Sequence, residues 1–209
     1  MKVKKMVTLA MLAAIAYLMV NLVRIPVVLF LKYEPKDVII TIGGFLFGPM
    51  ASFIISLVVS LLEMVTISDT GIIGCIMNLI STCSFACVAA AIYKKEHTLK
   101  GAIWGLVLGS VLMVGTMLLW NWLITPLYMG VDRATVEGML IPAFLPFNLL
   151  KAGLNSALTI GLYKPLSTAL RKIGLVETHA KSSKVGVYLL SGALLITCIL
   201  LLLVFQGKL

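Results

Sequence analysis

Residues 101–124 read GAIWGLVLGSVLMVGTMLLWNWLI, a stretch without a charged side chain. A helix needs roughly 20 mostly apolar residues to cross a bilayer, so this stretch is long enough to span one. A shorter apolar stretch, 37–48, abuts Gly48-Pro49, a pair that favours a tight reversal between two helices. Further long apolar stretches lie at residues 6–23, 49–66, 71–93, 144–165 and 185–206. The sequence therefore predicts an all-α, multi-pass membrane protein.

The composition supports the same class. Of the 209 residues, 61% are hydrophobic and 12% are charged, and the mean hydropathy is +1.11, far from the values of a soluble domain. The net charge of +9 could suggest nucleic acid. If the N-terminus is cytoplasmic and the segments alternate, however, most Lys and Arg residues fall in cytoplasmic loops, as membrane topology requires. The charge thus indicates orientation beside lipid headgroups, with no nucleic-acid partner.

The motifs of enzymes and energy-transducing proteins are missing from the sequence. There is no Gly-x-x-x-x-Gly-Lys-Ser/Thr loop, no His-Glu-x-x-His and no Gly-x-Ser-x-Gly. Cys83 and Cys87 are one helical turn apart, but no His or further Cys completes a metal site, so buried thiols are expected. An ion-coupled carrier would place ionisable groups deep in its spans, where this chain has essentially only Lys151. We expect a binding protein that is not an enzyme and has no metal or cofactor.

The candidate ligand site is the run Pro146-Phe-Asn-Leu-Leu-Lys-Ala-Gly-Leu-Asn155. Asn148, Lys151 and Asn155 are spaced i, i+3, i+7 and therefore share one face of a helix. A lysine in mid-membrane costs about 2.5–3.5 kcal/mol on insertion scales and usually faces a cavity or a partner. The face is predicted to bind a ligand. The alternative is that Lys151 forms a structural ion pair with Glu63 or Asp37.

Two outer segments could complete such a site. Residues 24–37, with a β-branched centre, predict an extended loop that is either a lid over a cavity or a mere connector, with Asp37 capping the next helix. Near residue 120, Asn121 and Thr125 share a helix face, and Thr125-Pro126 is expected to end that helix. The neighbouring aromatic residues could form an interfacial belt or part of a ligand site. They are Trp120, Trp122 and Tyr128.

Small residues form two ridges. Ala10 and Ala14 on the first helix follow the small-xxx-small pattern that lets helices approach closely in lipid. Gly101, Gly105 and Gly109 form a second ridge, which we expect to pack internally.

Several of these segments resemble a known family. The runs Asn121-Trp-Leu-Ile-Thr-Pro-Leu-Tyr-Met129, Leu145-Pro-Phe-Asn-Leu-Leu-Lys-Ala-Gly-Leu-Asn155 and Tyr163-Lys-Pro-Leu166 resemble the riboflavin-specific S components, which are the substrate-binding membrane subunits of bacterial energy-coupling-factor vitamin transporters. The resemblance spans roughly residues 5–172 and includes Ala10-x-x-x-Ala14.

The resemblance implies a six-helix bundle in the bacterial cell membrane, with a cytoplasmic N-terminus. Such a protein captures riboflavin from outside and docks on a transmembrane coupling subunit driven by two ABC-type ATPases. The implied flavin contacts are Asn121, Thr125, Asn148, Lys151 and Asn155, and the implied docking residues are Ala10 and Ala14. Alternatives are an S component for another vitamin, such as thiamine or biotin, and an autonomous secondary carrier.

The C-terminal part departs from the six-helix pattern. We predict an S-component domain over residues 1–176, a polar linker over 177–184 and an additional transmembrane helix within 185–209.

Overall fold

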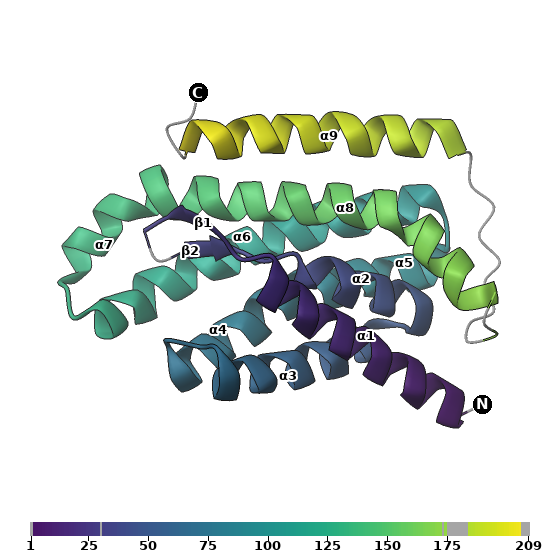
Figure 1. Ribbon diagram of the computed structural model, residues 1–209. Helices are drawn as coiled ribbons and strands as arrows, with labels where there is room; N and C mark the ends of the chain where they lie inside the picture. Colours follow the sequence, from purple (N-terminus) through teal and green to yellow (C-terminus); the bar gives the residue numbers. More distant parts are fainter. Residues whose placement is uncertain (1, 30, 173, 175–183, 206–209) are drawn as a thin grey trace.

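The computed structural model describes residues 2–29, 31–172, 174 and 184–205, and these form a bundle of roughly aligned helices (Figure 1). The helices are α1 (Lys2–Leu22), α2 (Lys36–Phe47), α3 (Pro49–Thr66), α4 (Gly71–Thr82), α5 (Val88–Glu96), α6 (Leu99–Met129), α7 (Arg133–Met139), α8 (Leu145–Lys172) and α9 (Lys184–Phe205). Two π-helical turns, Cys83–Cys87 and Leu140–Phe144, join α4 to α5 and α7 to α8. The all-α prediction is confirmed.

The predicted apolar stretches coincide with helices. By length and composition, the helical segments Val3–Leu22, Pro49–Thr66, Gly71–Glu96 and Leu99–Met129 could each cross a membrane. The predicted reversal lies at Gly48, whose φ of 91° is a conformation that glycine adopts readily, and Pro49 then starts α3. The predicted linker 177–184 falls outside the described residues except for Lys184. The division into 1–176, 177–184 and 185–209 stays a prediction.

The segment between α1 and α2 is a small antiparallel hairpin. Strand β1 (Ile25–Val28) pairs with β2 (Leu31–Tyr33), and a bulge shifts the register between Pro26 and Val28. The β-branched residues of this segment suit a half-buried strand better than a helix. The outer segment is therefore extended, as its sequence predicts, and it is folded back on itself.

The core is closely packed around small residues. On α6, a β carbon added at Gly105 would lie 2.7 Å from the Ala89 carbonyl oxygen, and one added at Gly109 would lie 2.5 Å from that of Phe85. The glycine ridge thus packs internally against α5 and the π-helical turn before it. On α1, Leu12 and Ala16 face inward, whereas Ala10 and Ala14 are exposed.

Two expectations about helix ends are wrong. Helix α6 does not end at Thr125-Pro126 but continues to Met129, where the Gly130 amide donates to the Pro126 carbonyl (3.0 Å). Proline removes its own backbone donor and its ring crowds the carbonyl four residues earlier, but its fixed φ is compatible with a helix, so one more turn forms beyond it. Asp37 does not cap α2: Pro35 holds that position, and the Asp37 side chain is buried in the bundle among polar partners.

Candidate functional site

A cavity of about 280 Å³ lies beneath the hairpin, between α4, α6 and α8. The hairpin contributes Leu31 and Lys32 to its wall, and the loop before α4 contributes Asp69. The size approaches the lower end of the range for small-molecule sites. In Figure 1 the hairpin and α7 lie toward one end of the bundle, and the N-terminus and the end of α8 lie at the other.

One wall of the cavity is polar and comes from α6 and α8. Asn121 and Thr125 line it from α6, and Asn148 and Lys151 line it from α8. On α6 the Thr125 hydroxyl donates to Asn121 Oδ1 (2.8 Å), while Asn121 Nδ2 donates to the Met117 carbonyl (2.7 Å). These bonds hold the side chains in place without using all of their donors and acceptors. Four of the five residues implied as ligand contacts therefore share one cavity wall, and their role in binding stays a prediction.

Asn155, the fifth residue, lies behind this wall. It is fully buried, donates to Asp37 Oδ2 (3.1 Å) and accepts a hydrogen bond from the Tyr33 hydroxyl (3.1 Å). Burial, together with the negative charge of Asp37, raises the pKa of Tyr33 above its ordinary value, so the hydroxyl stays protonated and can donate. Asn155 thus joins the hairpin to α8 and to the partner of Lys151.

Lys151 forms an ion pair with Asp37, as the alternative interpretation anticipates. Its Nζ lies 3.2 Å from Asp37 Oδ2, and Thr82 donates to the other carboxylate oxygen (2.7 Å). The Lys151 side chain keeps 11% of its surface exposed and also lines the cavity. Pairing with Asp37 and contact with a ligand are therefore compatible roles for this ammonium group.

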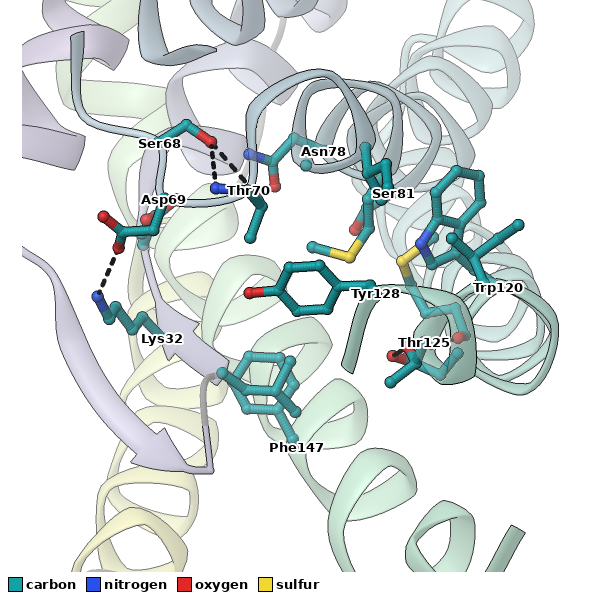
Figure 2. A pocket seen from close by; sticks show the side chains of 18 of the residues that line it. Lys32, Ser68, Asp69, Thr70, Asn78, Ser81, Trp120, Thr125, Tyr128 and Phe147 are labelled. Carbon is teal, nitrogen blue, oxygen red and sulfur yellow. Dashed lines mark hydrogen bonds and ion pairs between the residues drawn. The ribbon is translucent and has the colours of Figure 1, made fainter. Parts of the chain in front are cut away.

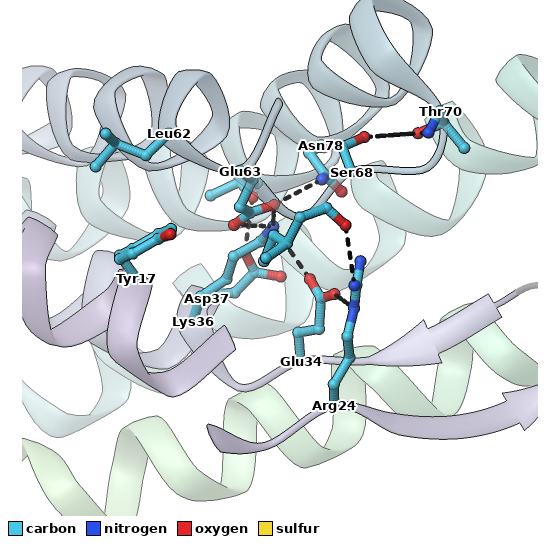
Figure 3. A network of polar contacts seen from close by, with 12 residues as sticks. Tyr17, Arg24, Glu34, Lys36, Asp37, Leu62, Glu63, Ser68, Thr70 and Asn78 are labelled. Carbon is cyan, nitrogen blue, oxygen red and sulfur yellow. Dashed lines mark hydrogen bonds and ion pairs between the residues drawn. The ribbon is translucent and has the colours of Figure 1, made fainter. Parts of the chain in front are cut away.

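The structure contains a second buried charge cluster, which the sequence did not predict. Lys36, which the alternating topology put in an outer loop, is the first residue of α2, and its side chain is only 1% exposed. Its Nζ lies 2.5 Å from Glu63 and 3.2 Å from Glu34 (Figure 3). Glu34 also accepts from Arg24 (2.8 Å), and Asn78 donates to Glu63 (2.9 Å). In the sequence, only Glu63 indicates this cluster: a carboxylate near the end of an apolar helix needs a cation as partner if it is buried.

Aromatic side chains also line the cavity. Trp120 and Tyr128 come from α6 and Phe147 from α8, and Figure 2 shows the three rings around the same space. Trp122 points elsewhere: its indole N–H donates to Glu137 (2.8 Å), and the Arg133 guanidinium lies 4.9 Å from its ring. The aromatic group is therefore divided, since only two of its three members face the cavity.

Comparisons with known proteins agree with this architecture. The family model "ECF transporter, substrate-specific component" matches residues 4–163. The riboflavin transporter RibU of Staphylococcus aureus (strain TCH60) is 29% identical over 180 residues, which cover 81% of this chain and 94% of that protein. The riboflavin transporter FmnP of Bacillus subtilis (strain 168) is 29% identical over 163 residues, 72% of this chain and 85% of that protein.

A solved structure extends the similarity to three dimensions. The S component of a bacterial ECF transporter superposes with a TM-score of 0.69 at 29% identity, over 82% of this chain and 99% of that one. The family is one of transport proteins, so the chain is a multi-pass membrane protein and not an enzyme. With the family match running from α1 into α8, this chain belongs to the substrate-specific components of ECF transporters.

Proposed function

We propose that this chain is the riboflavin-binding subunit of an ECF transporter, and that it captures extracellular riboflavin for ATP-driven uptake by partner subunits. The observation that carries the proposal is that one cavity is lined both by the polar side chains of Asn121, Thr125, Asn148 and Lys151 and by aromatic rings. The names of the relatives RibU and FmnP support riboflavin as the substrate.

The chemistry of riboflavin fits such a cavity. Its ring system is flat and largely apolar, which suits the rings of Trp120, Tyr128 and Phe147. Its imide-like edge offers donors and acceptors that the amides of Asn121 and Asn148 can match, and Lys151 can donate to a flavin carbonyl or a ribityl hydroxyl. A buried site of this kind rejects analogues that leave its polar atoms unpaired.

The charge distribution supports an orientation with the cavity toward the outside of the bacterial cell. Basic residues gather at the start of α1 and at the ends of α5 and α8, and such residues mark cytoplasmic ends of helices. They are Lys4, Lys5, Lys94, Lys95 and Lys172. In this orientation the N-terminus is cytoplasmic, and α1 offers the exposed Ala10 and Ala14 to a transmembrane coupling subunit, which two ABC-type ATPases drive.

The direct test is a riboflavin titration of the purified chain in detergent, followed by the loss of riboflavin fluorescence. We expect saturable quenching near one equivalent, with no displacement by excess thiamine or biotin. A well-folded protein that leaves riboflavin fluorescence unchanged but binds one of the other vitamins would contradict the proposal. In vesicles the chain alone should bind riboflavin without sustained uptake, because it lacks a nucleotide-binding P-loop motif.

A further inference from the structure

Helix α9 lies beyond the residues that the family match covers. The match ends at residue 163, whereas α9 begins at Lys184. In Figure 1, α9 runs beside α8 along one edge of the bundle, and α1 and α3 lie toward the opposite edge.

Helix α9 is seated in a groove of small residues on α8. Gly153, Ala157 and Gly161 are spaced four apart and so share one face of α8. A β carbon added at Gly153 would lie 2.7 Å from Cys198 Sγ, and one added at Gly161 would lie 2.7 Å from Ser191 Oγ. Small residues that allow such close approach are typical of specific helix pairs in membranes.

A hydrogen bond fixes the position of α9 in the groove. The Ser191 hydroxyl donates to the Ala157 carbonyl oxygen (2.8 Å), and Ser191 is 4% exposed. In an apolar environment a polar contact of this kind favours one arrangement of two helices over others. The pairing of α8 and α9 is therefore specific in position.

The same face of α9 reaches the hairpin. Ser191, Leu195, Cys198 and Leu202 follow the spacing of a single helical stripe. Leu195, Cys198 and Leu202, toward the C-terminal end of this stripe, belong to an apolar cluster that also contains residues of the hairpin and of α8. Helix α9 also contacts β1 directly. The cluster includes Val27, Leu31 and Tyr33 from the hairpin, and Phe147, Leu150 and Leu154 from α8.

Members of this cluster also border the ligand cavity. Leu31 and Phe147 belong both to the cluster and to the cavity wall, and Tyr33 donates to Asn155 behind the polar wall. The hairpin thus borders the cavity through Leu31 and shares an apolar cluster with residues of α8 and α9. A change in the position of α9 would remove apolar support from β1.

We propose that α9 holds the hairpin over the cavity and thereby slows the exit of the bound ligand. The part that concerns riboflavin rests on the proposed function. The part that concerns the hairpin can be tested without any ligand.

Two kinds of variant separate α9 from the remainder of the chain. One ends at residue 176, and the other carries Gly153→Leu with Gly161→Leu, which keeps α9 in the chain but fills its groove. Gly115→Leu is the matched control, because a β carbon at Gly115 on α6 would meet nothing within 4 Å. The double glycine variant also keeps the test available if the truncated chain does not fold.

The first measurement is hydrogen–deuterium exchange of the hairpin amides in the ligand-free proteins, read by mass spectrometry. The second is the release of radiolabelled riboflavin after mixing with excess unlabelled riboflavin. We expect faster exchange over residues 25–33 and about tenfold faster release in both α9 variants, and no change in the Gly115→Leu control.

The outcomes distinguish the two proposals. Unchanged hairpin exchange in a folded α9 variant would overturn the role of α9, whether or not the chain binds riboflavin. Faster exchange with unchanged release would overturn it as well, because the hairpin would then not retain the ligand. An intact chain that binds no riboflavin would contradict the proposed function instead, while the exchange experiment would still report whether α9 holds the hairpin.

Discussion

At the scale of single residues, Lys151 combines two electrostatic roles. Its ammonium group pairs with the buried Asp37 and also lines the cavity. Breaking a buried pair by removing one partner typically costs about 3–5 kcal/mol, since the other charge remains uncompensated, whereas replacing both partners by neutral groups is often tolerated. The two roles of Lys151 can therefore be separated by changing Asp37 as well.

We expect Lys151→Ala to lower the unfolding temperature and to weaken riboflavin binding at least tenfold, about 1.4 kcal/mol. The double variant Asp37→Asn with Lys151→Met should recover much of the stability, because no unpaired charge is left, but not the affinity. Thermal unfolding and fluorescence titration of the same preparations give both quantities. Wild-type affinity in the double variant would assign Lys151 a structural role alone.

Asn148 gives a test of the polar wall that does not disturb the charges. Its amide donates to the Phe144 carbonyl (2.8 Å), one turn earlier in the π-helical turn that precedes α8, and the residue lines the cavity. We expect Asn148→Ala to weaken riboflavin binding at least tenfold, about 1.4 kcal/mol, with little loss of stability. The exposed neighbour Leu149 is the control, and Leu149→Ala should bind as the wild type does. If Asn148→Ala binds riboflavin as tightly as Leu149→Ala and the wild type do, Asn148 does not contact the ligand.

Sequence spacing could place Asn121, Thr125, Asn148 and Lys151 on shared helix faces, because helical periodicity is a local property. It could not place Lys36 and Asp37, whose burial depends on where α2 begins and on partners more than twenty residues away in α3, α4 and α8. Two adjacent charged residues after a proline also suit an exposed loop, so the local pattern alone favoured that interpretation.

At the scale of elements, the hairpin is fixed by ion pairs of very different burial. Glu34, directly after β2, bridges Arg24 and the buried Lys36, and its side chain is 10% exposed. Lys32 on β2 lies 3.7 Å from Asp69, whose side chain is 80% exposed. Water screens the second pair, which should contribute little, whereas the first holds a buried cation.

We therefore expect Glu34→Gln to destabilise the protein by about 1–3 kcal/mol, because hydrogen-bonded charges lose a partner. Asp69→Asn should change stability by less than about 0.5 kcal/mol. Thermal unfolding of both variants in the same detergent compares them directly. Similar losses in the two variants would show that burial does not set the strength of these pairs.

At the scale of the whole molecule, the bundle offers separate surfaces for separate tasks. The cavity lies under the hairpin, and α1 leaves part of its surface exposed. Helix α9 runs along α8 at one edge of the bundle (Figure 1). On that face the small Ala10 and Ala14 are exposed together with the larger Met11 and Leu18. A surface of small residues beside larger apolar ones suits close packing with another helix in the membrane.

We expect Ala10→Trp with Ala14→Trp to abolish assembly with the coupling subunit, because two indole rings would keep a partner helix from approaching closely. Riboflavin binding should be unchanged, since neither residue lines the cavity. Co-purification with the coupling subunit tests the loss of assembly, and a riboflavin titration of the isolated variant tests the unchanged binding.

The chain that ends at residue 176 is the matched comparison. Helix α9 lies toward the other edge of the bundle, so its loss should leave assembly intact (Figure 1). Normal co-purification of the tryptophan variant would exclude Ala10 and Ala14 as the docking surface, and loss of assembly in the truncated chain would indicate that the coupling subunit contacts α9.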